Sequence, residues 1–219
     1  MKYIYILLSI TFSSLVTAEP EEYFGEYQGA VKTEWLEEGR KMKLLEDFNF
    51  TDPNEMVWLA PKDRVIDGAS IPKFVWSIIG SPFSGKYRNA SVIHDIACED
   101  KVRTWESVHL AFYYAMRASG VNSIKSKIMY AAVYHKGPRW PISKKVLVRE
   151  MQAVKTLDPS PGITGHKWIS VEIPAVYEVR VIAPSEQTLN EEQLEGLISK
   201  LENSNVELSI EDIQNYSVQ

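Results

Sequence analysis

Cysteine is almost absent from this sequence, and its scarcity limits how the fold can be held together. The 219 residues contain a single cysteine, Cys98. One thiol cannot form an intramolecular disulfide, so a disulfide-rich secreted scaffold is excluded. A zinc site built on paired cysteines is excluded for the same reason. The fold must therefore be held together by side-chain packing.

Long apolar runs are missing beyond the N-terminal residues. No later segment is apolar over a length that could cross a bilayer as a helix. The start of the chain has Lys2, an apolar stretch from Ile4 to Val16 and a small residue at Ala18, a pattern typical of a cleaved signal peptide. A retained N-terminal anchor is the alternative. We therefore expect an exported protein, periplasmic or secreted, with no transmembrane segment after cleavage.

Two stretches of the chain carry charges of almost one sign. Residues 117–149 contain eight Lys and Arg and no acid, whereas residues 186–219 contain eight acids and one lysine. A basic segment with interleaved aromatic residues can rest on anionic phospholipid headgroups. Nucleic acid is not expected as a partner, because the chain is exported and its net charge is -5. The expected partner is an anionic lipid surface or an envelope component, and the alternative is a solvated face balanced by the acidic tail.

The periodicity predicts strands first and helices afterwards. Turn residues separate three short strands in an antiparallel meander. Helical spacing follows, with Thr104 and Ser123 as expected N-caps and a capping box at Asn190. A Pro- and Gly-containing stretch at 158–162 is a candidate linker. The expected strands are 30–36, 41–50, 56–60, 167–173 and 176–182; the expected helices are 71–79, 84–99, 105–119, 123–134, a basic helix at 143–156, and 191–203, with a short turn after Ser209.

These elements predict an α+β fold. A short antiparallel β-meander is followed by packed helices, with a small C-terminal β/α extension. The expected division is a signal peptide at 1–18, a main domain at 19–157, and a C-terminal extension with an acidic tail at 158–219.

One turn motif and one helix carry the candidate chemistry. The motif 67–72 (DGASIP) is typical of a turn that feeds a helix, and His94 and Asp95 lie on the next predicted helix. A neutral imidazole can take a proton from water, so His94 is the candidate general base. Neighbouring helical residues point about 100° apart, so Asp95 is expected to act as a separate ligand or positioning group. Asp67, brought across space, is the expected partner of His94, and the predicted catalytic set is His94, Asp67 and Asp95.

The same residues also have structural explanations. His94 can be a buried histidine bonded to a backbone carbonyl, and Asp95 can belong to a structural ion pair. Asp67 can cap the turn, as Ser70 can cap the helix that follows. Cys98 lies four residues after His94 on the same helical face, where it forms either a Cys–His pair or a small buried apolar contact.

A metal site is a further candidate. His109 lies one predicted helix after His94 and faces it if the two helices pack antiparallel. Asp67, Asp95 and His109 are the candidate ligands of a divalent ion, although their spacing matches no zinc signature. The cofactor is left open, with a divalent metal ion as the candidate.

The motif 67–72, the residues 74–76 (FVW), Tyr87 and the run from Ala90 to Asp95 resemble a bacterial and phage family, the domain of unknown function 1353. Phe112, 115–116 (AM) and 119–121 (SGV) are similar to its second-helix pattern, and the resemblance covers about residues 30–140. It implies a shared fold and no known activity. The family tends to carry an acid on the second helix where this chain has His109.

The helix motif also resembles, by analogy of chemistry, that of secreted phospholipases of the A-two type. There a helix histidine is the general base, the neighbouring aspartate holds calcium, and a carboxylate from the following helix orients the imidazole. The glycine-rich calcium loop and the disulfides of those enzymes are missing here. We therefore expect an exported, envelope-acting hydrolase with His94 as base, a lipid ester being favoured over peptidoglycan. The alternative is a non-catalytic envelope or phage-related interaction module.

Overall fold

The structure is a computed structural model, and it describes residues 22–37, 41–67, 85–149, 153–157, 168–172, 176–184, 189–203 and 207–217. The expected signal peptide, the helix at 71–79, the linker at 158–162 and the motif residues after Asp67 lie outside the described residues. The α+β class is confirmed, because antiparallel strands are followed by packed helices.

Six short strands form two three-stranded sheets, and every pairing in them is antiparallel. One sheet has the order β1–β4–β5 and the other β2–β3–β6. The single strand expected at 41–50 is wrong in this detail, because the chain turns at 45–47 and its two halves enter different sheets. The strands are β1 (Glu26–Gln28), β2 (Thr33–Trp35), β3 (Met42–Leu44), β4 (Phe48–Thr51), β5 (Val57–Ala60) and β6 (Val65–Ile66).

Three helices follow the strands and begin close to the expected positions. A single 3-10 turn, η2 (Gly85–Tyr87), leads into α2 (Arg88–Asp100), which is followed by α3 (Trp105–Ala118) and α4 (Ser123–Lys136). Thr104 is the N-cap of α3 as predicted, and its side chain accepts a hydrogen bond from the Ser107 N–H. The N-cap of α4 is Asn122, one residue before the expected Ser123.

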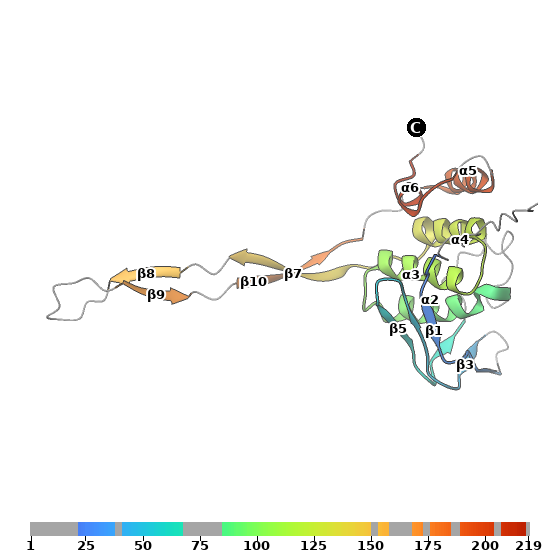
Figure 1. The fold of residues 1–219 in the computed structure, drawn as a ribbon, viewed down its shortest axis with the longest axis horizontal. Coiled ribbons are helices and arrows are strands. Elements are labelled where there is room, and N and C mark those ends of the chain that lie inside the picture. The colour runs from blue at the N-terminus through green and yellow to red at the C-terminus, as the bar shows by residue number, and fades with distance from the viewer. Residues whose placement is uncertain are drawn as a thin grey trace, which may run out of the picture.

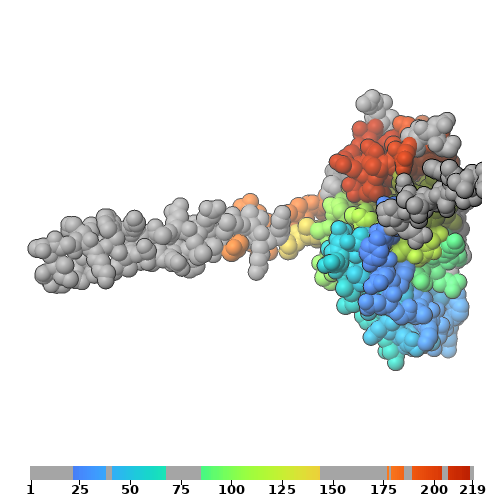
Figure 2. All heavy atoms as spheres, viewed as in Figure 1, coloured from blue at the N-terminus to red at the C-terminus, as the bar shows by residue number. Residues whose placement is uncertain are grey.

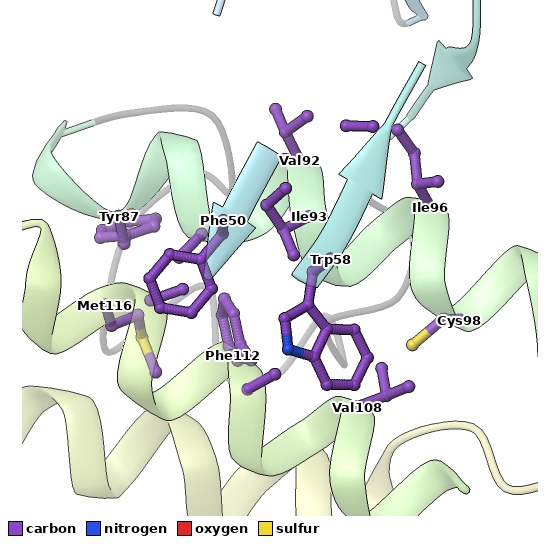
Figure 3. Close-up of a cluster of buried hydrophobic side chains, with 14 of the residues drawn as sticks. Phe50, Trp58, Tyr87, Val92, Ile93, Ile96, Cys98, Val108, Phe112 and Met116 are labelled. Atoms are coloured by element: carbon purple, nitrogen blue, oxygen red, sulfur yellow. The ribbon is translucent and has the colours of Figure 1, made fainter. Parts of the chain in front are cut away.

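The main core lies where α2 and α3 pack against β4 and β5. Phe50, Trp58 and Phe112 are buried there, and Figure 3 shows them meeting between the strands and the helices. The Tyr27 hydroxyl on β1 donates to the Ala115 carbonyl of α3 at 2.6 Å, which ties the first strand to the same helix. The sheets and the helices are therefore one packed body.

Four further strands form a long arm that projects from this body (Figure 1). β7 (Ile142–Arg149) pairs with β10 (Val176–Ile182), and β8 (Ala153–Leu157) pairs with β9 (Trp168–Glu172), both antiparallel. The strands expected at 167–173 and 176–182 are confirmed. The basic helix expected at 143–156 is wrong, because its β-branched residues pair with those later strands.

Two C-terminal helices, α5 (Glu191–Glu202) and α6 (Ile210–Gln214), pack on α4 and form a second buried cluster with it. The capping box at Asn190 is confirmed, and Ser209 caps α6 in the same way. Figure 2 shows α5 and α6 on the side of the body opposite the N-terminal strands. None of the helices that the structure describes has the length and apolar character needed to span a bilayer.

The expected domain boundary at 157/158 remains a prediction. Strands and helices from both sides of it are in contact, since β7 pairs with β10 and α4 packs against α5.

Candidate functional site

A pair of buried histidines joins α2 to α3. His94 is 1% exposed and His109 is 0% exposed, and the His94 Nε2 lies 2.9 Å from the His109 Nδ1. The short connection at 101–104 turns the chain back, so the two helices pack side by side, which is the condition under which His109 was expected to face His94. The Phe112 ring lies 4.5 Å from the His94 ring between centroids, which closes the apolar side of the pair.

One backbone carbonyl fixes the protons of both rings. The His109 Nε2 lies 3.1 Å from the Pro138 carbonyl oxygen, which can only accept. In the neutral pair, Nε2 of His109 therefore carries the proton and its Nδ1 accepts. The His94 Nε2–H must then be the donor to His109, which leaves the His94 Nδ1 as an acceptor.

Cys98 completes the cluster from one turn further along α2. Its Sγ lies 3.5 Å from Nε2 and 3.9 Å from Nδ1 of His94. Its side chain is 5% exposed, and Figure 3 shows it turned toward the same interior as Val108 and Phe112. The two alternatives for Cys98 were a pair with a histidine and a small buried apolar contact. The structure combines them, because the thiol lies beside the His94 imidazole within an otherwise apolar core.

Burial keeps both imidazoles neutral. It lowers the pKa of His109 from 6.5 to about 3, against the opposing effect of the hydrogen bond to Pro138. It also lowers the pKa of His94 well below 6.5, and the neighbouring His109 acts in the same direction. Neutral imidazoles and a thiol are the forms from which metal ligands are made.

The two aspartates meet at a different place. The Asp67 backbone N–H, at the end of β6, donates to the Asp95 Oδ2 at 3.0 Å. Arg64, just before β6, binds Glu99 and Asp100 near the end of α2, each at 2.7 Å. These contacts hold β6 along α2, so the described contact of Asp95 is structural.

The predicted site residues therefore fall into two pairs in the described contacts. His94 meets His109, and Asp67 meets Asp95. Cys98 joins the histidine pair, so the ligand atoms of His94, Cys98 and His109 all lie within 4.8 Å of one another. The catalytic set His94, Asp67 and Asp95 and the ligand set Asp67, Asp95 and His109 remain predictions.

The sequence did not indicate that Pro138 and Arg139 lie around the histidine pair. The Arg139 guanidinium lies 4.2 Å from the centre of the Trp105 ring, while Trp105 lies 5.7 Å from the His109 ring. A backbone carbonyl has no sequence signal of its own. The only available sign was the turn at Gly137–Pro138, which brings that carbonyl back to α3.

Comparison with known proteins gives two relatives from Sinorhizobium fredii (strain NBRC 101917 / NGR234). The chain is 45% identical to its uncharacterized protein y4jT over 141 residues, which are 64% of this chain and 42% of y4jT. It is 46% identical to its uncharacterized protein y4iH over 99 residues, which are 45% of this chain and 41% of y4iH. The chain thus spans less than half the length of either relative.

No solved structure matches the chain. The family described as protein of unknown function (DUF1353) matches residues 42–133, which contain β3 to β6, α2, α3 and most of α4. The resemblance found in the sequence is confirmed, and this chain carries the DUF1353 family's pattern across the strands and helices that hold the histidine pair.

Proposed function

We propose that this protein is a non-catalytic interaction protein of the cell envelope, and that its arm docks on an anionic lipid surface. The observation that carries the proposal is a row of exposed apolar side chains on β10. Tyr177, Val179 and Val181 are 60%, 61% and 69% exposed. Alternate residues of a strand project to the same face, so the three form one continuous stripe.

Among the residues that the structure describes, β7 and β10 form a two-stranded sheet with no second sheet layer over the stripe. Two-stranded ribbons are marginally stable in water without a packing partner. Contiguous exposed apolar surface of this kind marks a contact with a protein or a membrane.

Charge favours an anionic surface. The strands β7 and β10 contain four Lys and Arg and one Glu, which gives +3, while the whole chain carries -5 and the remainder therefore -8. Lys144 pairs with Arg180 in the ribbon, and Lys145 with Val179. A cation near an anionic leaflet contributes about 1 kcal/mol. Lysines and arginines on a ribbon that also carries an apolar stripe suit the boundary between headgroups and acyl chains.

Vesicle co-sedimentation tests the proposal. The full chain without residues 1–18 is mixed with vesicles of phosphatidylglycerol and phosphatidylcholine, and with vesicles of phosphatidylcholine alone. We expect binding to the anionic vesicles that weakens as salt is raised, because the cationic contribution is screened. Replacing Tyr177, Val179 and Val181 together by serine should reduce that binding by at least tenfold.

Leu59→Ser is the matched control. Leu59 is 59% exposed on β5 of the body, a fraction close to that of each stripe residue, so Leu59→Ser removes exposed apolar surface away from the arm and should bind like the unchanged protein. Equal binding to neutral vesicles, or unchanged binding by the triple variant, would refute the proposal. A dimer that the triple variant loses would instead assign the stripe to a second copy.

A hydrolase with His94 as base is the second candidate. The chain of hydrogen bonds from His94 through His109 to Pro138 supports it, because a general base needs its second nitrogen held in one tautomer. The Nδ1 of His94 would take the proton from water, and Asp67 and Asp95 would position the substrate or an ion. The substrate would be a lipid ester, ahead of peptidoglycan.

Purified protein assayed on labelled phospholipid and on peptidoglycan tests this candidate. Loss of turnover in His94→Ala and Asp67→Asn, with circular dichroism unchanged, is the expected result. Absence of turnover with every divalent metal tried would refute the hydrolase candidate and favour the interaction protein. Export itself is tested by sequencing the N-terminus of the periplasmic or secreted protein, where cleavage after Ala18 is expected.

A further inference from the structure

We infer that His94, Cys98 and His109 form a binding site for one thiophilic d10 cation, Zn²⁺ or Cu⁺, that links α2 to α3. The ligand atoms are the His94 Nε2, the Cys98 Sγ and the His109 Nδ1, which all lie within 4.8 Å of one another. The metal ligands predicted from the sequence are Asp67, Asp95 and His109, and this site keeps only His109 of them.

The separations fit a metal after a small movement. Zinc bonds of about 2.05 Å to nitrogen and 2.3 Å to sulfur in a tetrahedral site imply about 3.3 Å between two nitrogens and about 3.5 Å between nitrogen and sulfur. The two nitrogens lie 2.9 Å apart, and the Cys98 Sγ lies 3.5 Å from the His94 Nε2. The rings need to part by about 0.4 Å on that standard, a shift that side-chain rotation supplies.

The outer contacts also suit a metal centre. A histidine that binds a metal usually donates its other ring N–H to a carbonyl or carboxylate, which fixes the ligating nitrogen. His109 does this through its Nε2, which lies 3.1 Å from the Pro138 carbonyl. The Nδ1 of His109 is therefore already the nitrogen with a lone pair directed at the cluster.

The choice of ion follows from the ligands and their burial. A thiolate with two imidazoles selects Zn²⁺ or Cu⁺ over Mg²⁺ and Ca²⁺, which prefer oxygen ligands. All three side chains are at most 5% exposed, so the ion is enclosed and acts as a cross-link between helices. Binding releases the thiol proton, and the His94 ring proton moves from Nε2 to Nδ1 so that the Nε2 lone pair can bind the metal.

The site is independent of the docking arm. It excludes His94 as a general base, because a metal on Nε2 moves the ring proton to Nδ1. The metal site and the hydrolase candidate therefore predict different behaviour of the same residue.

Metal loading of the reduced full chain without residues 1–18 tests the inference. The protein is titrated with Zn²⁺, with Cu⁺ under anaerobic conditions, and with Co²⁺ as a spectroscopic substitute. We expect one ion per chain, a thiolate-to-cobalt charge-transfer band, and a rise in melting temperature of roughly 5–10 °C when Zn²⁺ is present at 100 times its Kd.

Cys98→Ser should lose the charge-transfer band, and His109→Gln should lose stoichiometric binding. The control is His135→Gln, which removes another buried histidine whose Nε2 bonds the Ile213 carbonyl at 2.8 Å, outside the cluster. This variant should bind one ion like the unchanged protein. Absence of stoichiometric binding of all three ions by folded, reduced protein, or binding of Zn²⁺ by Cys98→Ser with unchanged affinity, would overturn the inference.

Discussion

His109 decides what the buried pair can do. An acid at this position would hold a positive charge on the neighbouring imidazole. His109 is neutral and offers only a lone pair to the His94 Nε2–H. The pair is therefore adapted to remain uncharged inside the core.

Acid should destabilise the protein through these buried histidines. The pKa of His109 is lowered from 6.5 to about 3 on folding, so between these values the unfolded state binds more protons than the folded state. Stability should be complete above about pH 6.5 and fall toward pH 3, by about 1.4 kcal/mol per pH unit for each such histidine. Urea unfolding at a series of pH values measures this slope.

His109→Gln is the comparison for that slope. A glutamine cannot titrate, so the dependence on pH should be shallower by the share of one histidine. The pKa of His94 is lowered as well, so a residual slope of the same sign should remain. An unchanged slope in this variant would contradict the assignment of His109 as a group that titrates on unfolding.

An acid at position 109 should raise the pKa of His94. In His109→Asp, a carboxylate would replace a neutral ring beside the His94 Nε2, and the opposite charge should raise the pKa of His94 by 1 unit or more, about the smallest effect of a close ion pair. NMR titration of the His94 ring signals measures the change. His135, which bonds Ile213 elsewhere, serves as the internal reference and should not move.

At the scale of elements, helix starts could be predicted and the arm could not. Thr104 and Asn190 have side chains that bond the backbone three residues later, so a local sequence signal defines these caps. The strand β7 depends on β10, whose first residue, Val176, pairs with Arg149. No local pattern in 143–156 records that distant partner, and its lysines and leucine suit a helix equally well.

In the candidate site, too, some contacts could be predicted from the sequence and others could not. His109 is expected to face His94 if the two helices pack antiparallel, and the structure places the two rings in contact. Asp67 is expected beside His94, and its described contact is the hydrogen bond from its backbone N–H to Asp95. The position of a residue at the end of a two-residue strand depends on how the sheet packs against α2, which spacing alone does not reveal.

Removing the cap of α3 should weaken the helix that carries His109. The Thr104 hydroxyl accepts from the Ser107 N–H at 3.2 Å, so Thr104→Ala leaves that donor without its partner. We expect a loss of about 1 kcal/mol in the free energy of unfolding. Thr104→Ser keeps the hydroxyl and should recover most of the loss; a similar loss in both variants would show that the methyl contact matters more than the cap.

For the whole molecule, the arm should be separable from the body. Ile142 and Ile182 are paired, so the chain leaves the body and returns to it at one place. Replacing residues 143–181 by a short Gly-Ser turn should keep the melting temperature of the body within a few degrees and abolish binding to anionic vesicles. Calorimetry and co-sedimentation measure the two effects, and a body that unfolds without the arm would contradict this description.

The helix α4 has a consequence for how the protein acquires its structure. Its residues belong to both buried clusters: Met129 and Val133 face the first, while Ile128 and Ala131 face the second. A helix with apolar side chains on two faces needs a packing partner on each of them. The second face of α4 is therefore fully covered only when Ile213 has been synthesised. A chain that ends before that residue would expose part of this apolar face, which chaperones and proteases recognise.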